Sequence, residues 1–518
     1  MYEKFLQGIS PREYQKEILE KCKEKNCLVI LPTGIGKTLI ALMLSIERLT
    51  KHPTEKILFL APTRPLAEQH FNYFKKHLPE LFGEMDLFTG KVSADKRKKI
   101  WQRTDIVFST PQCIGNDLKK KLYDLKEVSL LIEDEVHRCV KNYAYTYVAK
   151  KYIEQSLNER ILGMTASPGA NKESIKKICE NLSIDAVEIR TRESDDVKEY
   201  LQELNIKKIE IPFPEKFKEI RTLLEKIWLK NIQDLKSRNI LFGPANKISV
   251  IECQKKIMRS ISTGNKNPNL FHGASACAQA IKISHAIELL ETQTLSSLNQ
   301  YVDSIIEQGE KGKTRAVKNL ILNPNFTLSV QLIKKLVDEK KEHPKLIELK
   351  SLIEERITND EKTKIIIFCQ FRDSITKICK ELNTIKKVNA KVFVGQTKKG
   401  ETGLSQKEQK EVIEQFKNKE FNVLCATSIG EEGLDIPEVS AVIFYEPVPS
   451  AIRKIQRAGR TARLMPGELI MLITKGTRDE IYYWSAIRKE KSMHKAIKEI
   501  KTDLHEGKIS KNDQTKLF

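Results

Sequence analysis

The chain has 518 residues, which at ~150 residues per domain predicts about three domains and excludes disulfide miniproteins and fibrous arrays. Lys and Arg number 90 against 69 Asp and Glu, so the formal net charge is +21. This excess indicates a polyanionic partner, either nucleic acid or an acidic membrane surface. A solvated lysine-rich surface of the kind found in thermophile proteins is the alternative.

The ten cysteines are scattered, and none forms a C-x-x-C pair. Many lie inside apolar runs, which predicts buried thiols in a reducing compartment and neither zinc ligands nor a disulfide framework. The first residues lack the apolar run of a signal peptide, and no stretch approaches the ~18 apolar residues of a membrane span. We therefore expect a soluble intracellular protein with no membrane-spanning segment.

Short apolar runs typical of buried strands recur through the first third of the chain, with helix-period segments between most of them. They cover residues 27–32, 56–61, 105–110, 128–133 and 160–165. A second series covers residues 364–369, 391–395, 422–427, 441–446 and 468–474. Strands that alternate with helices predict parallel sheets covered on both faces, so we expect an α/β protein with two such units of similar size.

The pattern changes at residues 213–345, where apolar residues such as Phe217, Ile220 and Leu224 recur at helical spacing. This segment holds 22 Lys and Arg against 13 Asp and Glu, a net charge of +9. We expect a mainly helical, basic insert domain here. The remaining boundaries place α/β domains at 1–200 and 346–475, and a C-terminal helix and tail at 476–518.

A glycine-rich turn, LPTGIGKT, follows the first expected strand at residues 31–38. Gly34 and Gly36 would let backbone N–H groups close on phosphate oxygens at the start of a helix, while Lys37 reaches the β- and γ-phosphates and Thr38 ligates Mg²⁺. The strict pattern G-x-x-x-x-G-K-[ST] is not met, because Leu31 occupies the first glycine position. The flanking strand and helix nevertheless favour a phosphate-binding loop over a plain turn.

An acidic segment, Glu133 to Glu135, ends the fourth expected strand. At the carboxyl edge of a parallel sheet, Asp134 is placed to hold Mg²⁺ and Glu135 to polarise an attacking water. An isolated acidic strand end is usually solvated surface. Together with the phosphate loop about a hundred residues earlier, it predicts a Mg²⁺-dependent nucleoside triphosphatase.

Further motifs resemble those of superfamily 2 helicases, specifically the DNA-repair translocase branch of archaeal Hef and the Fanconi-anaemia M proteins. The resemblance covers residues 10–495. In the first domain it rests on PREYQ (11–15), APTRPL (61–66), TG (89–90), STPQ (109–112) and TASPG (165–169), and in the second on FCQFRDS (368–374), ATSIGEEGLDIP (426–437) and QRAGRTAR (456–463). The Hef-like branch is favoured by KNYAY (141–145), HAIELLETQ (285–293), GLSQKEQ (403–409), EPVPSAIR (446–453) and GTRDEIYYWS (476–485).

The resemblance implies two RecA-like domains on either side of the insert, with ATP and Mg²⁺ as cofactors. The ATP contacts it implies are Arg12, Gln15, Thr33, Gly34, Gly36, Lys37, Thr38, Gly433 and Asp435, and the metal ligands are Thr38 and Asp134. The catalytic residues are Lys37, Asp134, Glu135, Gln456, Arg460 and Arg463. Arg460 and Arg463 would stabilise charge on the γ-phosphoryl group from across the domain cleft, and His137, Thr165 and Ser167 would couple hydrolysis to movement.

Polar residues at the expected strand ends suit contacts with phosphate and sugar, which give affinity without sequence information. They are Thr63, Arg64, Thr89, Gly90, Thr110, Gln112, Gln370, Arg372 and Thr427. Phe371 is the main candidate for base stacking, with a place in the core as its alternative. Three positions depart from the family pattern, namely Val136, Ala458 and Ala462, and their effect stays open.

The leading interpretation is an ATP-dependent DNA translocase and helicase that acts on forked or branched DNA in repair and replication restart. Such a protein would be cytoplasmic and, in a prokaryote, associated with the nucleoid. Two alternatives stay open: a double-stranded RNA-stimulated ATPase of the related RNA-sensor type, and the helicase half of a helicase–nuclease. The latter would have a nuclease domain or a separate nuclease chain as partner, since no E-R-K-x-x-x-D cluster occurs in the last hundred residues.

Overall fold

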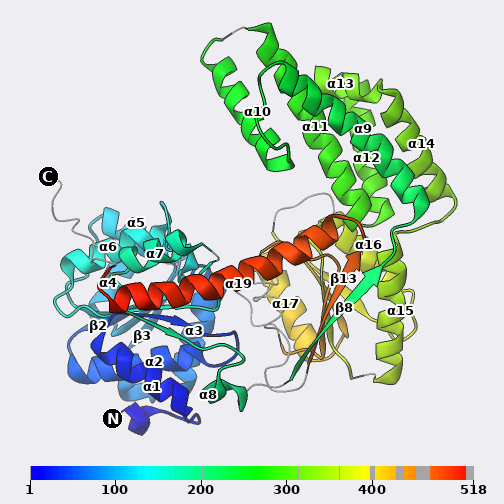
Figure 1. Ribbon diagram of the computed structural model, residues 1–518. Coiled ribbons are helices and arrows are strands. Elements are labelled where there is room, and N and C mark those ends of the chain that lie inside the picture. Colours follow the sequence, from blue (N-terminus) through cyan, green and yellow to red (C-terminus); the bar gives the residue numbers. More distant parts are fainter. Residues whose placement is uncertain are drawn as a thin grey trace.

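The computed structural model describes residues 2–169, 171–200, 203–265, 267–312, 314–360, 362–396, 403–427, 437–450 and 467–508. It contains a first α/β domain, a second α/β domain and a helical insert that stands on the second domain (Figure 1). The expected α/β class with a helical insert is confirmed. Within the described ranges, no helix has both the length and the apolar character needed to cross a membrane.

The first domain is built on a seven-stranded parallel sheet with strand order β3-β4-β2-β5-β6-β1-β7. Its strands are β1 (Cys27–Ile30), β2 (Lys56–Leu60), β3 (Met85–Phe88), β4 (Ile106–Ser109), β5 (Val128–Asp134), β6 (Ile161–Thr165) and β7 (Ala186–Ile189). This order puts the carboxyl ends of β2, β5, β6 and β1 side by side. The loops that follow these four strands therefore meet at one edge.

Helices cover both faces of this sheet. They are α1 (Glu13–Glu24), α2 (Lys37–Lys51), α3 (Arg64–His77), α4 (Ala94–Arg103), α5 (Pro111–Lys119), α6 (Ala144–Gln155), α7 (Lys172–Asn181) and α8 (Asp195–Lys198), with short 3-10 turns η1 (Tyr2–Phe5), η2 (Glu80–Phe82) and η3 (Val136–Arg138). Alternate residues of the strands bury against α1–α3 on one face and against α4–α7 on the other. Burial on both faces explains why the central strands are continuous apolar runs.

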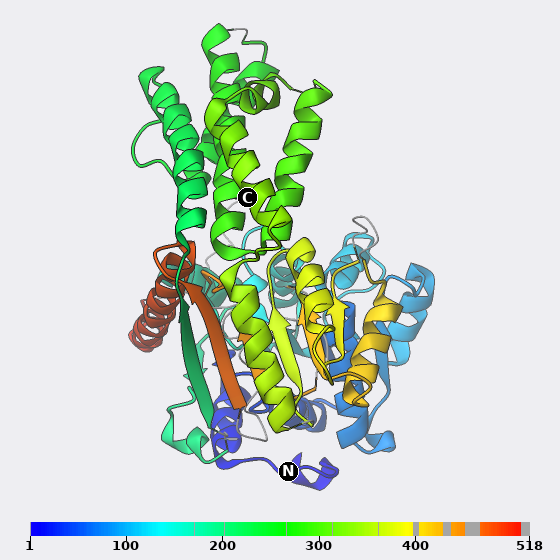
Figure 2. The same cartoon turned by 90° about the vertical axis from the view of Figure 1, so that its right-hand side faces the viewer.

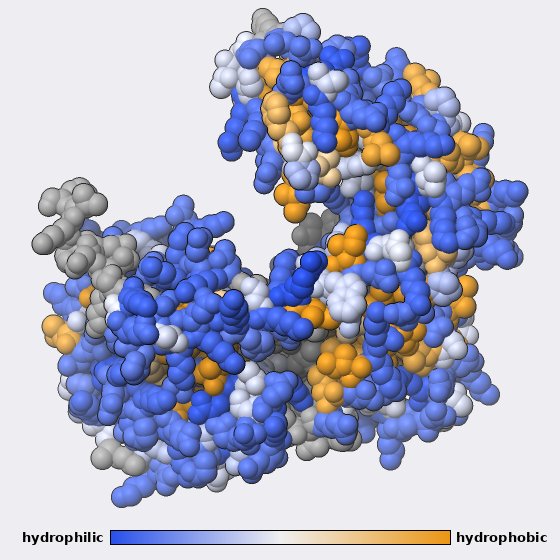
Figure 3. All heavy atoms as spheres, viewed as in Figure 1, coloured by the Kyte–Doolittle hydropathy of each residue, from blue (hydrophilic) through white to orange (hydrophobic). Residues whose placement is uncertain are grey.

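The insert consists of α9 (Glu215–Ser237), α10 (Lys247–Ser262), α11 (Pro268–Thr292), α12 (Leu295–Glu310), α13 (Arg315–Ile321) and α14 (Pro324–Asp338). Two apolar clusters hold it together, one among α9, α11, α12, α13 and α14 and a smaller one among α9, α10 and α11. Figure 2 shows these helices rising together from the second domain, and Figure 3 shows a hollow between the insert and the first domain.

The second domain has a six-stranded parallel sheet with strand order β10-β11-β9-β12-β13-β8. Its strands are β8 (Leu204–Ile211), β9 (Ile365–Phe368), β10 (Ala390–Phe393), β11 (Val423–Ala426), β12 (Ala441–Phe444) and β13 (Gly467–Thr474). Helices α15 (Pro344–Asn359) and α16 (Arg372–Leu382) cover one face, and α17 (Gln406–Lys417) covers the other.

All ten expected strand runs contain a strand, but β3, β7 and β8 were not expected. Each of these three lies at the edge of a sheet. An edge strand is less enclosed, so its sequence carries polar residues and lacks a long apolar run. The pattern of β8, with Asn205 and Lys207 on exposed positions, is an example.

The last helix, α19 (Arg478–His505), follows β13 and runs from the second domain to the first (Figure 1). Its C-terminal half buries Met493, Ala496, Ile497 and Ile500 in the apolar core of the first domain. Its first half lies near the insert, where Arg478 contacts α11. One continuous helix therefore contacts both α/β domains and the insert.

Candidate nucleotide site and nucleic-acid track

The phosphate loop connects β1 to α2. Gly34 and Gly36 have φ angles of 88° and 84°, in the left-handed region that glycine tolerates best. A Cβ atom on Gly36 would lie 2.3 Å from the Gln15 amide nitrogen, so the close approach also requires glycine there. The Lys37 ammonium turns back into the loop and donates to the carbonyl oxygens of Leu31 (2.9 Å) and Pro32 (3.4 Å).

The PREYQ segment (11–15) contacts this loop through hydrogen bonds. The buried Gln15 amide donates to the carbonyl oxygens of Ile35 (3.2 Å) and Gly36 (3.3 Å), and the Tyr14 hydroxyl donates to that of Ile35 (2.5 Å). The Arg12 guanidinium lies 4.6 Å from the centre of the Tyr200 ring. The motif is thus placed beside the loop, and contact of Arg12 and Gln15 with an adenine base stays a prediction.

His70 of α3 joins the two predicted metal ligands. Its Nε2 lies 2.8 Å from Asp134 Oδ2, and its Nδ1 lies 3.5 Å from Thr38 Oγ1. The imidazole is 6% exposed and packs on Phe59, with ring centres 4.5 Å apart. Burial acts to raise the pKa of Asp134, but the hydrogen bond and charge of His70, together with Lys37, outweigh burial and hold that pKa below its usual value.

The oxygen ligands fit a hard divalent cation, because a carboxylate and a threonine hydroxyl meet beside the phosphate loop. Sequence patterns did not identify His70, since a single histidine on a helix has no diagnostic spacing. The only available signal was its place in AEQH, directly after APTRPL and six residues after the start of α3.

Glu135 begins the turn after β5 in a left-handed conformation, with φ of 51° and ψ of 47°. Its Oε2 lies 3.3 Å from His137 Nδ1 and 3.4 Å from Thr165 Oγ1 at the end of β6. Thr165 Oγ1 in turn accepts from the Ser167 backbone N–H at 3.1 Å. The structure therefore brings the predicted water-activating and coupling residues together on adjacent strand ends.

Met493 and Val136 lie next to the cluster formed by Glu135, His137, Thr165 and Ser167. The Ser167 hydroxyl donates to the sulfur of Met493 in α19 at 2.9 Å, a contact that sequence patterns did not predict. Val136, which departs from the family pattern, is fully buried and lies in the core between the sheet and its helices. A Cβ atom on Gly163 of β6 would lie 3.4 Å from the Val136 side chain, which shows how closely the two are packed.

The remaining nucleotide-site predictions fall outside the described residues. These are Gly433, Asp435, Gln456, Arg460 and Arg463, together with the departures Ala458 and Ala462. The described part of the cleft has a volume of about 490 Å³ and is lined by α3, by α17 and by Thr38 of α2. Lys410 of α17 donates to both carboxylate oxygens of Glu68 in α3, each at 2.9 Å, and so bridges the two α/β domains.

The predicted nucleic-acid contacts of the first domain lie at the carboxyl ends of its strands. Thr63 and Arg64 begin α3 after β2, Thr89 and Gly90 follow β3, and Thr110 and Gln112 begin α5 after β4. Thr63 Oγ1 and Arg64 Nε are buried, and neither has a hydrogen-bond partner among the described residues. Buried polar atoms are nearly always paired, so these two favour a ligand at this edge.

Basic side chains that sequence reasoning missed lie around the same edge. Gln112 lines a pocket of about 560 Å³ to which Lys119, Lys141 and Lys150 also contribute. The buried Arg97 of α4 donates to Asp117 of α5 at 2.6 and 2.5 Å and to the Thr89 carbonyl at 3.4 Å. Arg97 thereby fixes the Thr89 loop against α5.

In the second domain, Gln370 and Arg372 follow β9, and Thr427 follows β11. The Gln370 backbone N–H donates to Glu446 at 2.5 Å, and Arg372 donates to the Gly395 carbonyl at 3.1 Å. Phe371 is half-buried against the insert core, with its ring 5.4 Å from that of His285. This packing supports the core alternative for Phe371 over a base-stacking role.

Comparison with known proteins agrees with this arrangement of loops and domains. Residues 12–175 match the DEAD/DEAH box helicase family, residues 345–465 match the helicase conserved C-terminal domain, and residues 216–343 match the helical bundle of a putative ATP-dependent RNA helicase. The fold and the matched domains are thus those of a superfamily 2 helicase.

The crystal structure of the Pyrococcus furiosus Hef helicase domain is 42% identical, with a TM-score of 0.71, and the match covers 92% of this chain and 98% of that one. A putative ATP-dependent RNA helicase of Methanocaldococcus jannaschii is 38% identical over 95% of this chain and 61% of its own length. The mouse Fanconi anemia group M protein homolog is 32% identical, and the match covers 94% of this chain and 26% of that protein. The chain belongs to the Hef and Fanconi-anaemia M branch of the superfamily 2 helicases, and it spans about a quarter to three-fifths of these two curated relatives.

Proposed function

We propose that the chain is an ATP-dependent DNA translocase and helicase that acts on forked or branched DNA. The observation that carries this proposal is that Thr38 and Asp134 both contact His70 beside the phosphate loop, where Thr38 and His70 line the cleft between the α/β domains. The binding of ATP in such a cleft can close the two domains, and the release of its products can open them again, while both domains contact a nucleic-acid strand. The names of relatives add support, because the Neurospora crassa protein mph1, 35% identical over 90% of this chain, is an ATP-dependent DNA helicase.

The chain's own residues have distinct tasks in this proposal. The N-terminal N–H groups of α2 and Lys37 bind the phosphates, and Thr38 and Asp134 would hold Mg²⁺, which supplies charge neutralisation on the phosphate oxygens. Glu135 orients the attacking water, and its contacts with His137 and Thr165 connect that position to Ser167. The polar residues at the strand ends contact the phosphate backbone, so binding does not depend on base sequence.

The substrate preference is tested by ATP hydrolysis with matched fork DNA, single-stranded DNA and duplex RNA. We expect fork DNA to stimulate turnover most strongly. Stimulation by duplex RNA alone would replace the proposal with the RNA-stimulated ATPase, an alternative favoured by the name of the Methanocaldococcus relative. Because DNA is held through phosphates, the affinity should also fall steeply with rising salt concentration.

On branched DNA the chain would act with a nuclease, either as a further domain of the same polypeptide or as a separate chain. Its place would then be the cytoplasm, at the nucleoid in a prokaryote. Co-purification with a nuclease activity specific for branched DNA tests this partner, and cleavage of forks at the same rate with and without the chain would contradict it.

A further inference from the structure

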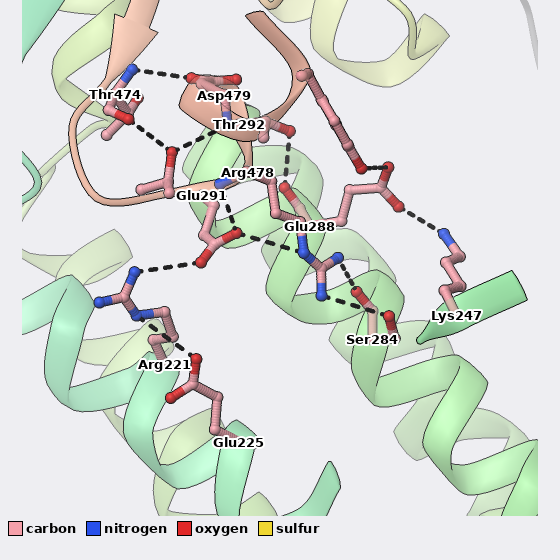
Figure 4. Close-up of polar contacts among 12 residues, drawn as sticks. Arg221, Glu225, Lys247, Ser284, Glu288, Glu291, Thr292, Thr474, Arg478 and Asp479 are labelled. Carbon is pink, nitrogen blue, oxygen red and sulfur yellow. Dashed lines mark hydrogen bonds and ion pairs between the residues drawn. The ribbon is translucent and has the colours of Figure 1, made fainter. Parts of the chain in front are cut away.

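Two segments that the proposed function leaves without a role meet at the base of the insert. HAIELLETQ (285–293) forms the C-terminal end of α11, and GTRDEIYYWS (476–485) forms the turn after β13 and the first turns of α19. They are far apart in the sequence and lie together in the fold (Figure 4). We refer to residues Arg221, Lys247, Ser284, Glu288, Glu291, Arg478 and Tyr482 as the insert junction.

Glu291 lies at the centre of the insert junction and is 4% exposed. One carboxylate oxygen accepts from the Arg221 guanidinium of α9 at 3.3 Å. The other accepts from the backbone N–H of Arg478 at 3.3 Å and lies 3.5 Å from Arg478 Nε. A carboxylate at this point satisfies a free N–H of the first turn of α19 and is favoured by the helix dipole.

Arg478 extends the contact along α11. Its guanidinium donates to the Ser284 carbonyl at 2.7 Å and to the Ser284 hydroxyl at 3.4 Å. Ser284 and Glu291 are two helical turns apart, so the arginine spans that length of α11 and fixes the direction of this helix relative to α19. Arg221 connects α9 to the same site, because it also donates to the Gly476 carbonyl in the turn before α19 at 2.8 Å.

Glu288 of α11 connects α10 to the insert junction. Its carboxylate accepts from Lys247 at the start of α10 (2.6 Å) and from the Tyr482 hydroxyl of α19 (3.3 Å). His285 Nδ1 lies 3.3 Å from the same carboxylate. All three long helices that begin the insert are therefore bonded, directly or through α11, to the start of α19.

The insert junction also connects to both α/β domains. Gln293, one residue beyond α11, donates to Glu446, which accepts from the backbone N–H of Gln370 in the predicted nucleic-acid track. At its other half, α19 reaches the coupling loop, where Met493 accepts from Ser167. The described contacts thus run without a break from the insert through α19 to the loop beside Glu135.

We infer that Arg478, held by Glu291, is a positioning residue that fixes the insert on α19. Through α19 and the Ser167 loop, the binding of DNA at the insert then changes the rate of ATP hydrolysis. This inference rests on the proposed function and names how that function is regulated. The contacts that the structure describes for Arg478 are with Ser284 and Glu291, away from the phosphate loop, so its loss should affect the response to DNA and leave basal turnover in place.

The first test compares fork-stimulated with basal ATP hydrolysis in Arg478→Gln, Glu291→Gln and the double variant. Allosteric coupling energies correspond to factors of about 5 to 150. We expect stimulation to fall by about tenfold in each single variant, with little further loss in the double variant because both have lost the same contact. Arg238→Gln is the matched control, since Arg238 pairs with Asp234 within the insert at 2.8 Å. Equal stimulation in Arg478→Gln and Arg238→Gln would overturn the inference.

The second test needs no DNA and no activity. Spin labels at exposed Lys256 of α10 and exposed Glu354 of α15 report the orientation of the insert on the second domain, and the ten native cysteines are buried. The distance distribution should broaden in Arg478→Gln and stay narrow in Arg238→Gln, and an unchanged distribution would overturn the positioning role. If the wild type shows no DNA stimulation, the proposed function fails, while the distance measurement still decides what Arg478 does.

Discussion

The nucleotide region and the insert junction each contain a buried glutamate, and the pKa values of the two are shifted in opposite directions. Glu133 precedes the metal ligand Asp134, and neither of its carboxyl oxygens has a hydrogen-bond partner among the described residues. Burial raises the pKa of Glu133 to about 8, against an opposing effect of the Cys139 thiol. Burial acts in the same direction on Glu288 of the insert junction, but His285 and Lys247 outweigh it and lower the pKa of Glu288 to about 2.

The difference follows from what surrounds each carboxyl group. Glu133 lies within one sheet, enclosed by apolar layers, and no cation among the described residues contributes to its pKa. Glu288 lies where three helices meet, and each of the other two presents a donor to it. The environment of Glu133 is thus formed within the first domain, whereas the insert junction is held by charges contributed from separate parts of the chain. Changes in the nucleotide region should affect all hydrolysis, and changes in the insert junction only its response to DNA.

The largest effect is expected for Lys37→Ala in the nucleotide region. Loss of a charged donor to the transferring phosphoryl group should lower kcat by on the order of 10²–10³, with and without DNA. Lys51→Ala at the exposed end of the same helix is the control. DNA-stimulated turnover that survives in Lys37→Ala would show that the site has been assigned to the wrong loop.

His70→Ala should weaken the metal site. Residues that orient metal ligands typically contribute 10–100-fold in metal affinity, so the Mn²⁺ concentration needed for binding with nucleotide should rise by about that factor. Binding is measured by electron paramagnetic resonance, independently of turnover. His77→Ala is a matched control, because His77 is a buried histidine of the same helix that bonds the Gln7 carbonyl. Equal Mn²⁺ affinity in both variants would refute the role of His70.

Glu288→Gln should destabilise the insert junction by about 2 kcal/mol near pH 7, because a buried ionised acceptor is lost. The depressed pKa means that this contribution is complete above about pH 4.5 and disappears as the pH falls toward about 2. Thermal midpoints of the variant and the wild type should therefore converge over this range. Glu225→Gln, a half-exposed site in α9, should show no such convergence.

Glu133→Gln should show the opposite pH dependence. A raised pKa makes the folded wild type bind a proton that the unfolded chain releases, so wild-type stability falls as the pH rises from about 4.5 to 8. The variant has no such carboxyl group, so its free energy of unfolding should rise relative to that of the wild type by about 1.4 kcal/mol per pH unit at most. Parallel thermal midpoints across this range would mean that Glu133 is ionised in the fold.

The sequence predicted the central strands and the phosphate loop because both are local patterns. A strand buried on both faces is a continuous apolar run, and the turn around Gly34 and Gly36 needs residues that tolerate positive φ. The edge strands β3, β7 and β8 have no such run and were missed. His70 and Arg97 were also missed, since each acts through partners 20 to 64 residues away.

By itself, the sequence determined the nucleoside triphosphatase motifs, the order of the domains and the basic helical insert, because these depend on residue type, spacing and charge along the chain. The helicase class followed from the resemblance of its motifs to a known family. Only the tertiary structure decided which groups meet. It placed His70 between Thr38 and Asp134, and it brought Arg478 to Glu291 across 187 positions. Contacts between distant segments depend on how sheets and helices pack, and that packing has no periodic signature in the sequence.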